Sequence, residues 1–134
     1  SKHLLLELYR CDCEKLNDES FLRCTLNKAA KLAKATVLNL ISNKCEPQGV
    51  TAIALLAESH ISIHTFPELG YFSFDCYSCK DFDHLIVLQT IRELIPTGTE
   101  VAQLCGRFPP QLLEGKVDMK NYDANRRIIS KITV

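Results

Sequence analysis

Two pairs of residues have types and spacings that could do chemistry. Cys76 and Cys79 form a C-x-x-C pair, a spacing found in thiol-redox motifs and in metal sites. His60 and His64 lie four residues apart, and on a helix that spacing would place both imidazoles on one face, where they could hold a metal ion. The chemistry of each pair therefore depends on the element that positions it.

Both pairs fall in segments typical of β-strands. Residues 60–66 alternate polar and β-branched side chains, and residues 71–78 form an aromatic-rich run. Residues three apart in a strand point to opposite faces, so the two sulfurs should diverge. Four strand residues span ~13 Å, which is too far for two histidines to share one ion. We therefore expect no metal site and two independent thiols.

A third motif, Glu58-Ser59-His60, lies where a buried apolar strand meets the alternating one. Composition and spacing alone make it a polar junction between two strands. On that basis the sequence would support no more than a small α+β domain.

Hydrophobic periodicity predicts the elements that carry these motifs. Helices are expected at residues 18–34 and 82–95, and strands at residues 3–10, 36–41, 50–57, 60–66, 71–78 and 99–105. The connections between the middle strands are too short for parallel crossovers. The predicted fold class is therefore α+β, a two-layer sandwich with an antiparallel sheet and two helices on one face. A second subunit could cover the other face, which would make a dimer.

Composition excludes several classes of protein. The chain has 134 residues, and its 16 basic side chains cancel 16 acidic ones, which argues against a nucleic-acid partner. No apolar run approaches the ~20 residues of a membrane span. The cysteine count is seven, an odd number, and no export signal is visible. We therefore expect a cytoplasmic protein whose thiols are free and mostly buried.

Two segments carry a family resemblance. Residues 47–79, PQGVTAIALLAESHISIHTFPELGYFSFDCYSC, resemble the core of prokaryotic S-adenosylmethionine decarboxylases. The opening HLLLELYRCD and the LND that follows resemble the start of that family. The resemblance runs from residue 3 to about 105. It implies a decarboxylase-like domain over residues 1–108 and a C-terminal extension over residues 109–134.

The resemblance implies a proenzyme that cuts itself between Glu58 and Ser59. The β chain would be residues 1–58, and the α chain would be residues 59–134. Ser59 would become a pyruvoyl group at the new terminus, a covalent cofactor that forms a Schiff base with the substrate amine and accepts electrons as carbon dioxide leaves.

Two further residues match processing roles in this family. Thr51 occupies the position of a hydroxyl, usually serine, that assists the cyclic processing intermediate. His64 matches the base that removes the α-proton of Ser59. In an unbroken strand, residues 59 and 64 face opposite ways, so we expect a bend or bulge between residues 58 and 61.

The family match also assigns residues to turnover and substrate binding. Cys79 matches the proton donor, and a free thiol is mostly protonated at neutral pH. Phe66 and Glu68 match positions that contact the adenine and the ribose of S-adenosylmethionine. Cys45 departs from the family, which commonly has an aromatic residue there.

The function implied is decarboxylation of S-adenosylmethionine, which supplies the aminopropyl donor for spermidine synthesis, by a homodimer of processed chains. Two alternatives stay open on the sequence. One is a pyruvoyl-dependent ornithine or arginine decarboxylase on the same fold, which needs no adenine site. The other is a non-enzymatic or thiol-redox module that uses the C-x-x-C pair.

Overall fold

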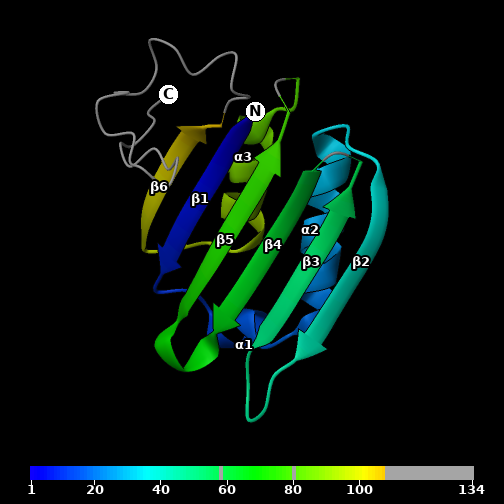
Figure 1. Cartoon of the computed structure of the whole chain (residues 1–134). Helices are drawn as coiled ribbons and strands as arrows, with labels where there is room; N and C mark the ends of the chain where they lie inside the picture. Colours follow the sequence, from blue (N-terminus) through cyan, green and yellow to red (C-terminus); the bar gives the residue numbers. More distant parts are fainter. Residues whose placement is uncertain (58, 80, 108–134) are drawn as a thin grey trace, which may run out of the picture.

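The structure is a computed structural model and describes residues 1–57, 59–79 and 81–107. Its elements follow in chain order (Figure 1): β1 (Lys2–Tyr9), α1 (Cys13–Leu16), α2 (Glu19–Leu32), β2 (Val37–Lys44), β3 (Val50–Leu56), β4 (Ser59–Phe66), the 3-10 turn η1 (Pro67–Leu69), β5 (Tyr71–Ser78), α3 (His84–Leu94) and β6 (Thr99–Gly106).

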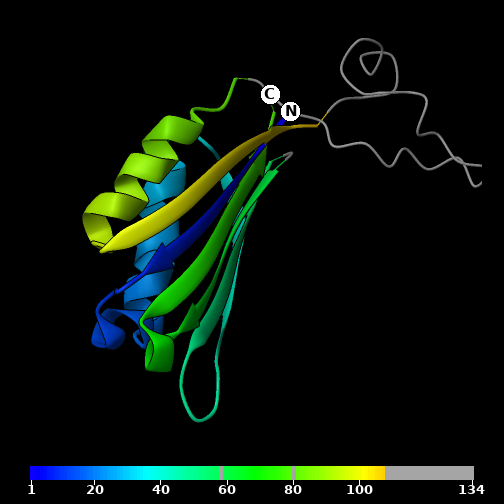
Figure 2. The ribbon, with the colours of Figure 1, turned by 90° about the vertical axis from the view of Figure 1, so that its left-hand side faces the viewer.

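The strands form one six-stranded sheet in the order β2-β3-β4-β5-β1-β6. Every neighbouring pair is antiparallel. The helices α2 and α3 lie on one face, and the opposite face is bare in the described chain (Figure 2). The predicted two-layer α+β sandwich is confirmed.

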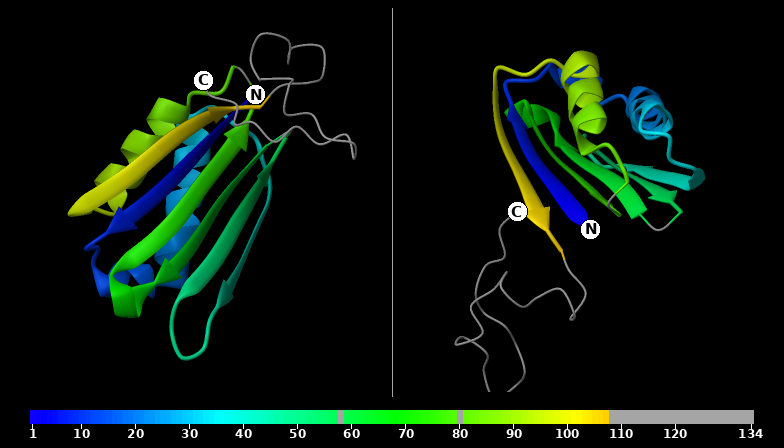
Figure 3. Two further views of the ribbon diagram at one scale, coloured as in Figure 1. Left: turned by 60° about the vertical axis from the view of Figure 1, so that its left-hand side comes forward. Right: turned by 90° about the horizontal axis from the view of Figure 1, so that it is seen from above.

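The two long helices begin at aspartate caps and bury one face each. Asp18 accepts a hydrogen bond from the backbone N–H of Phe21, and Asp83 accepts from Leu85 and Ile86. Such caps satisfy amide groups that have no partner in the first helical turn. The buried faces carry apolar and small residues: Leu22, Leu26, Ala29 and Ala30 of α2, and Val87, Leu88 and Ile91 of α3. The two helices lie on the same side of the sheet and contact each other there (Figure 3).

Each central strand buries alternate side chains, which separates the sheet into two surfaces. In β1 the side chains of Leu4, Leu6 and Leu8 are buried beneath the helices, and the residues between them reach the other side. In β4 the same side receives Ile61 and Ile63. We call the side without helices the open face. Because a strand alternates, every second residue is available for chemistry there.

Some boundaries differ from the predicted ones. The strand β2 runs three residues further than expected, since Asn43 and Lys44 still pair with Thr51 and Val50 of β3. The short α1 and η1 were not predicted as helical turns. The extension over residues 109–134 lies outside the described residues. Among the described residues, no helix has the length and apolar character needed to cross a membrane.

The prediction that most cysteines are buried is wrong. The seven thiols are unpaired in the described part of the chain, as expected, but only Cys11 and Cys76 are buried. Cys13 and Cys24 are exposed because they lie on the outer sides of α1 and α2, at positions that the apolar stripe of each helix does not include.

Candidate active site

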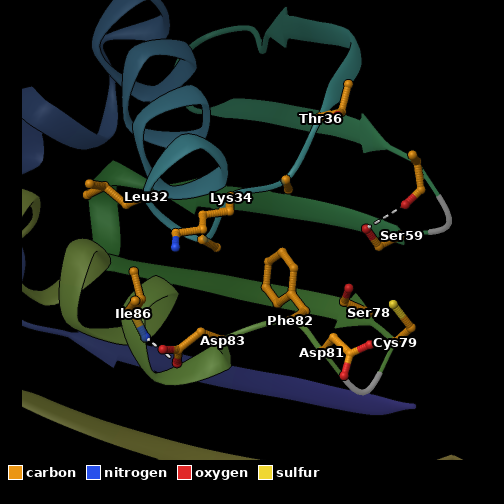
Figure 4. A pocket seen from close by; sticks show the side chains of 13 residues that line it. Leu32, Lys34, Thr36, Ser59, Ser78, Cys79, Asp81, Phe82, Asp83 and Ile86 are labelled. Carbon is orange, nitrogen blue, oxygen red and sulfur yellow. Dashed lines mark hydrogen bonds between the residues drawn. The ribbon is translucent and has the colours of Figure 1, made fainter.

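Ser59 and Cys79 lie at the same end of the sheet. Ser59 is the first residue of β4, and Cys79 directly follows β5, whose Tyr77 pairs with His60. Both residues line a cavity of about 480 Å³ between this end of the sheet and the helices. Figure 4 shows the two side chains at the same end of that cavity. The exposed Cys79 thiol and Ser59 are therefore both accessible from the same cavity.

The backbone from Ser59 onward is a regular strand. Leu56 pairs with Ser59, Leu55 with His60 and Ala54 with Ile61, without a register shift. The predicted bend or bulge is therefore wrong for residues 59–61, and Glu58 lies outside the described residues. The Ser59 hydroxyl donates to the carbonyl oxygen of Ala57 at 3.5 Å. Since only two residues connect the paired Leu56 and Ser59, the predicted cleavage point lies at a hairpin tip.

Thr51 and His64 form a second group, on the open face. They are directly opposite each other on β3 and β4, and Thr51 Oγ1 lies 3.2 Å from His64 Nδ1. The hydrogen bond leaves the other ring nitrogen, Nε2, available to a substrate or a second chain. His64 is exposed, so an external group can reach it.

The predicted substrate-binding residues lie beyond His64, at the far end of β4. Phe66 ends the strand, is 40% exposed and stacks on Tyr71 with ring centroids 5.4 Å apart. Glu68 follows within η1 and is exposed. The backbone of Cys45 donates to the carbonyl of Gly49 in the neighbouring turn, and Cys45 is partly buried. This end of the sheet thus offers an aromatic surface beside a carboxylate.

The structure therefore places the predicted site residues in two separate groups. We call Ser59 and Cys79 the serine group, and Thr51, His64, Phe66 and Glu68 the histidine group. Five residues of extended strand separate Ser59 from His64, a span of ~16 Å. Their side chains also leave β4 on opposite faces, because Ser59 shares the parity of the buried Ile61. One chain alone does not bring these groups into contact.

The two cysteines of the C-x-x-C pair have different surroundings. Cys76 is buried on the helix side, whereas Cys79 is exposed at the end of the strand. Burial, with a smaller effect from the Asp75 charge, raises the pKa of the Cys76 thiol to about 12. A thiol that resists ionisation is a poor nucleophile and a poor metal ligand, which disfavours the thiol-redox alternative.

Sequence reasoning missed a polar cluster on the open face next to the serine group. Asp75 Oδ2 lies 2.7 Å from His3 Nε2 and 3.1 Å from His60 Nε2, and its Oδ1 accepts from the Ser62 hydroxyl. Burial alone would raise the pKa of Asp75, but the hydrogen bonds from Ser62, His3 and His60 lower it below its ordinary value. The sequence did contain one indication, a single aspartate within an aromatic-rich strand. Its partners could be identified only once the order of the strands in the sheet was known.

Comparison with known proteins places the chain in a family. The sequence model of the S-adenosylmethionine decarboxylase family matches residues 2–105. The S-adenosylmethionine decarboxylase proenzyme of Prochlorococcus marinus (strain MIT 9313) is 64% identical over 80 residues, which cover 60% of this chain and 64% of that protein. The match thus spans less than two thirds of that relative's length.

A second relative is covered almost completely. The S-adenosylmethionine decarboxylase proenzyme 2 of Halalkalibacterium halodurans is 41% identical over 119 residues, or 87% of this chain and 94% of the relative. The crystal structure of the adenosylmethionine decarboxylase from Aquifex aeolicus VF5 superposes with a TM-score of 0.73 at 30% identity, over 81% of this chain and 92% of that one. The chain belongs to the S-adenosylmethionine decarboxylase family.

Proposed function

We propose that this chain is a self-processing, pyruvoyl-dependent decarboxylase of S-adenosylmethionine. The observation that carries the proposal is the serine group: Ser59 at a hairpin tip and Cys79 on the adjacent strand end, beside one cavity. Both residues match, by sequence resemblance, the nucleophile and the proton donor of this family, whose sequence model covers residues 2–105. The relatives are named proenzymes, which agrees with processing at Ser59.

Processing uses the chain's own atoms. The Ser59 hydroxyl attacks the carbonyl carbon of residue 58, and the peptide bond becomes an ester. Removal of the Ser59 α-proton expels the carboxylate of the 1–58 chain and leaves a dehydroalanine. Water then adds to this residue, ammonia leaves, and a pyruvoyl group remains at the start of residues 59–134. The open space beside Ser59 admits such a small acyl group, because the serine lines a cavity and is not packed in the core.

The position of Ser59 decides from which side a base must approach. Its side chain lies on the helix side of β4, so the hydrogen on its tetrahedral Cα is inclined towards the open face. His64 presents its imidazole on the open face but ~16 Å away in the same chain. The base that reaches Ser59 is therefore the His64 of another copy.

A second copy stacked on the open face would supply that base. If a two-fold axis lies between the two sheets and across their strands, the strands run in opposite directions and the strand end that carries Ser59 in one chain lies opposite the histidine group of the other. The open face also carries exposed apolar side chains that such stacking would cover: Tyr9, Ile41, Leu55, Phe66 and Val101. We therefore propose a homodimer with two sites, each built from both chains.

In turnover, the pyruvoyl group supplies the electron sink for decarboxylation. The Cys79 thiol, exposed beside it, donates a proton to the substrate carbon that has lost carbon dioxide. Phe66 provides a partly exposed ring for the adenine, and Glu68 accepts hydrogen bonds from the ribose. These two residues favour S-adenosylmethionine over ornithine or arginine, which have neither group.

The proposal is tested with purified full-length chain. A denaturing gel should show two fragments divided before residue 59, and borohydride in the presence of substrate should fix the substrate covalently to the larger one, residues 59–134. Labelled carbon dioxide should be released from carboxyl-labelled S-adenosylmethionine and not from ornithine or arginine. An uncut chain with an ordinary amino terminus would contradict the proposal.

Two variants separate processing from turnover. Ser59→Ala should remain one intact, inactive chain. Cys79→Ala should be cut to some extent and fold normally, yet lose most turnover, because Cys79 acts on the substrate. Wild-type turnover in Cys79→Ala would show that Cys79 is not the proton donor.

A further inference from the structure

The cluster of His3, His60 and Asp75 on the open face has no role in the processing or turnover described above. The three ligand atoms, His3 Nε2, His60 Nε2 and Asp75 Oδ2, all lie within 4.8 Å of one another. None of the three side chains is fully exposed, since their exposed fractions are 20%, 37% and 23%. The cluster is therefore partly sheltered and still open to a small ion.

The donor set suits a transition metal. Two imidazoles and one carboxylate are ligands that Zn²⁺ and its neighbours in the first row accept readily. Bonds of ~2.0–2.1 Å place adjacent ligand atoms roughly 2.9–3.4 Å apart. The observed contacts from Asp75 Oδ2, 2.7 Å to His3 and 3.1 Å to His60, are close to that range. The two imidazole nitrogens lie within 4.8 Å of each other, and side-chain shifts that bring them to a common ion would turn the three hydrogen-bonding atoms into three ligands.

The surroundings of Asp75 hold it ready to act as a ligand. Its second oxygen accepts the hydroxyl of Ser62, which fixes the plane of the carboxylate. Ligating carboxylates in metal sites are oriented by hydrogen bonds of this kind.

The scaffold beneath the cluster is rigid. The ligands come from three adjacent central strands, β1, β5 and β4, and both His3 and His60 pair in register with Tyr77. The two histidine rings are nearly perpendicular, with an interplanar angle of 84° and centroids 6.1 Å apart. Sites on strands hold ligand geometry better than sites on loops, so little ordering is required when an ion binds.

We propose that His3, His60 and Asp75 form a binding site for one divalent first-row transition ion of the Zn²⁺ type. The ion is held by both Nε2 atoms and by Asp75 Oδ2, and water completes its coordination. Each imidazole then carries its proton on Nδ1. The site does not depend on the proposed decarboxylase activity.

Cobalt(II) serves as the probe, because its visible absorption reports coordination directly. The full-length Ser59→Ala chain is titrated with Co²⁺, so that no pyruvoyl group or cleavage complicates the result. We expect one saturable site per chain, together with loss of the His3 and His60 imidazole signals from ¹⁵N-histidine spectra. The signals of His84, which is buried on the helix side, should persist. With diamagnetic Zn²⁺, His3 and His60 should show the Nδ1–H tautomer.

Variants decide which side chains bind. Asp75→Asn and His3→Gln, each in the Ser59→Ala chain, should weaken Co²⁺ binding by ~100-fold or more, because each removes one of three ligands. His64→Gln is the matched control, an open-face histidine outside the cluster, and should bind as the parent does. Circular dichroism and thermal melting of each variant show whether its fold is intact; His60→Gln replaces any variant that does not fold.

Three results would overturn the site. These are no saturable binding, equal binding by Asp75→Asn and His3→Gln, or a thiolate-to-cobalt charge-transfer band. The last would assign the ion to a cysteine, such as Cys105, whose strand position pairs with His3. Because the parent chain is inactive by design, failure here leaves the proposed function untouched, and failure of that function leaves this site untouched.

Discussion

The two faces of the sheet are built from the same strands but have opposite characters. Along β4, Ile61 and Ile63 are fully buried under the helices, and the residues between and after them include Ser62 and His64 on the open face. The same alternation places Cys76 in the core and Asp75 on the open face. One face therefore stabilises the fold, and the other presents polar side chains such as Ser62, His64 and Asp75.

The comparison shows why adjacent residues should respond differently to substitution. Burial of apolar side chains supplies most of the free energy of folding, so substitutions on the helix side should mainly lower stability. Exposed polar groups contribute little to stability, so substitutions on the open face should mainly change the rates of processing and turnover. Each prediction below tests this division, with the largest effect first.

His64→Gln should slow processing by ~10²–10⁴-fold, because it removes the base and leaves the exposed position otherwise similar. The rate of fragment formation on a denaturing gel measures the effect. The melting temperature should stay near that of the parent chain. A large drop in melting temperature would show that this open-face residue stabilises the fold. That result would contradict the assignment of stability to the helix side and of chemistry to the open face.

A mixed dimer should recover what His64→Gln loses. When His64→Gln and Ser59→Ala chains are co-expressed, the first supplies Ser59 and the second supplies His64. The His64→Gln chain should then be cut at a rate near that of the parent, a recovery of ~10²-fold or more. Tags of different length identify which chain is cut. Cleavage that stays as slow as in His64→Gln alone would mean that each chain uses its own histidine.

Ile63→Ala, one residue away, should act on stability. Ile63 is fully buried, and truncation of such a residue lowers the free energy of unfolding by ~2–5 kcal/mol. Urea unfolding of the uncut Ser59→Ala background measures it. Below the melting transition, the fraction of Ile63→Ala chain that is folded should process at the parental rate.

Leu55→Glu should weaken self-association without unfolding the chain. Leu55 is 51% exposed on the open face, so a carboxylate there is solvated in the monomer and buried between stacked sheets in the dimer. We expect the dimer dissociation constant to rise by ~10-fold or more, which corresponds to ~1.4 kcal/mol. Sedimentation or light scattering over a concentration series measures it. Lys28→Glu, on the helix surface, is the control and should not change the dimer.

His84 should give the smallest effect, a change in how stability depends on pH. Burial lowers the pKa of His84 below its ordinary value of 6.5, and the hydrogen bond to the Lys2 carbonyl only partly opposes this. On acidification the unfolded chain therefore takes up a proton first. Stability should fall as the pH drops from about 7 through the lowered pKa of the folded state.

The His84→Gln variant should show a shallower decline over that range. Urea unfolding at several pH values compares the two slopes. The parent and the variant should differ most below the ordinary histidine pKa. Identical slopes would mean that the buried imidazole does not titrate differently in the folded chain.

Much of the fold could be predicted from sequence because hydrophobic periodicity and helix capping depend on residues that are close together in the chain. Asp18 and the spacing of Leu22 and Leu26 predicted α2, and the alternation of residues 60–66 predicted β4. The separation of Ser59 from His64 also follows from alternation. The predicted bulge between them was an added assumption, needed only if one chain made the whole site.

The polar cluster around Asp75 could not be predicted in the same way. His3 pairs through β1 with a strand more than seventy residues away, and the strand order that brings it beside His60 is a tertiary property. Nothing in the local pattern of residues 1–10 distinguishes His3 from an ordinary strand-edge histidine. Long-range register, not residue type, decides which side chains become neighbours.

The strand order has a consequence for the proposed cleavage before Ser59. Residues 1–58 hold β1, β2 and β3, and the second fragment holds β4, β5 and β6, yet β1 lies between β5 and β6. The two products are therefore interlocked: release of either would require the ladders β3–β4, β5–β1 and β1–β6 to open together. The proposed cleavage before Ser59 would therefore leave the two fragments joined by three strand ladders, and the new terminus would stay at the start of β4.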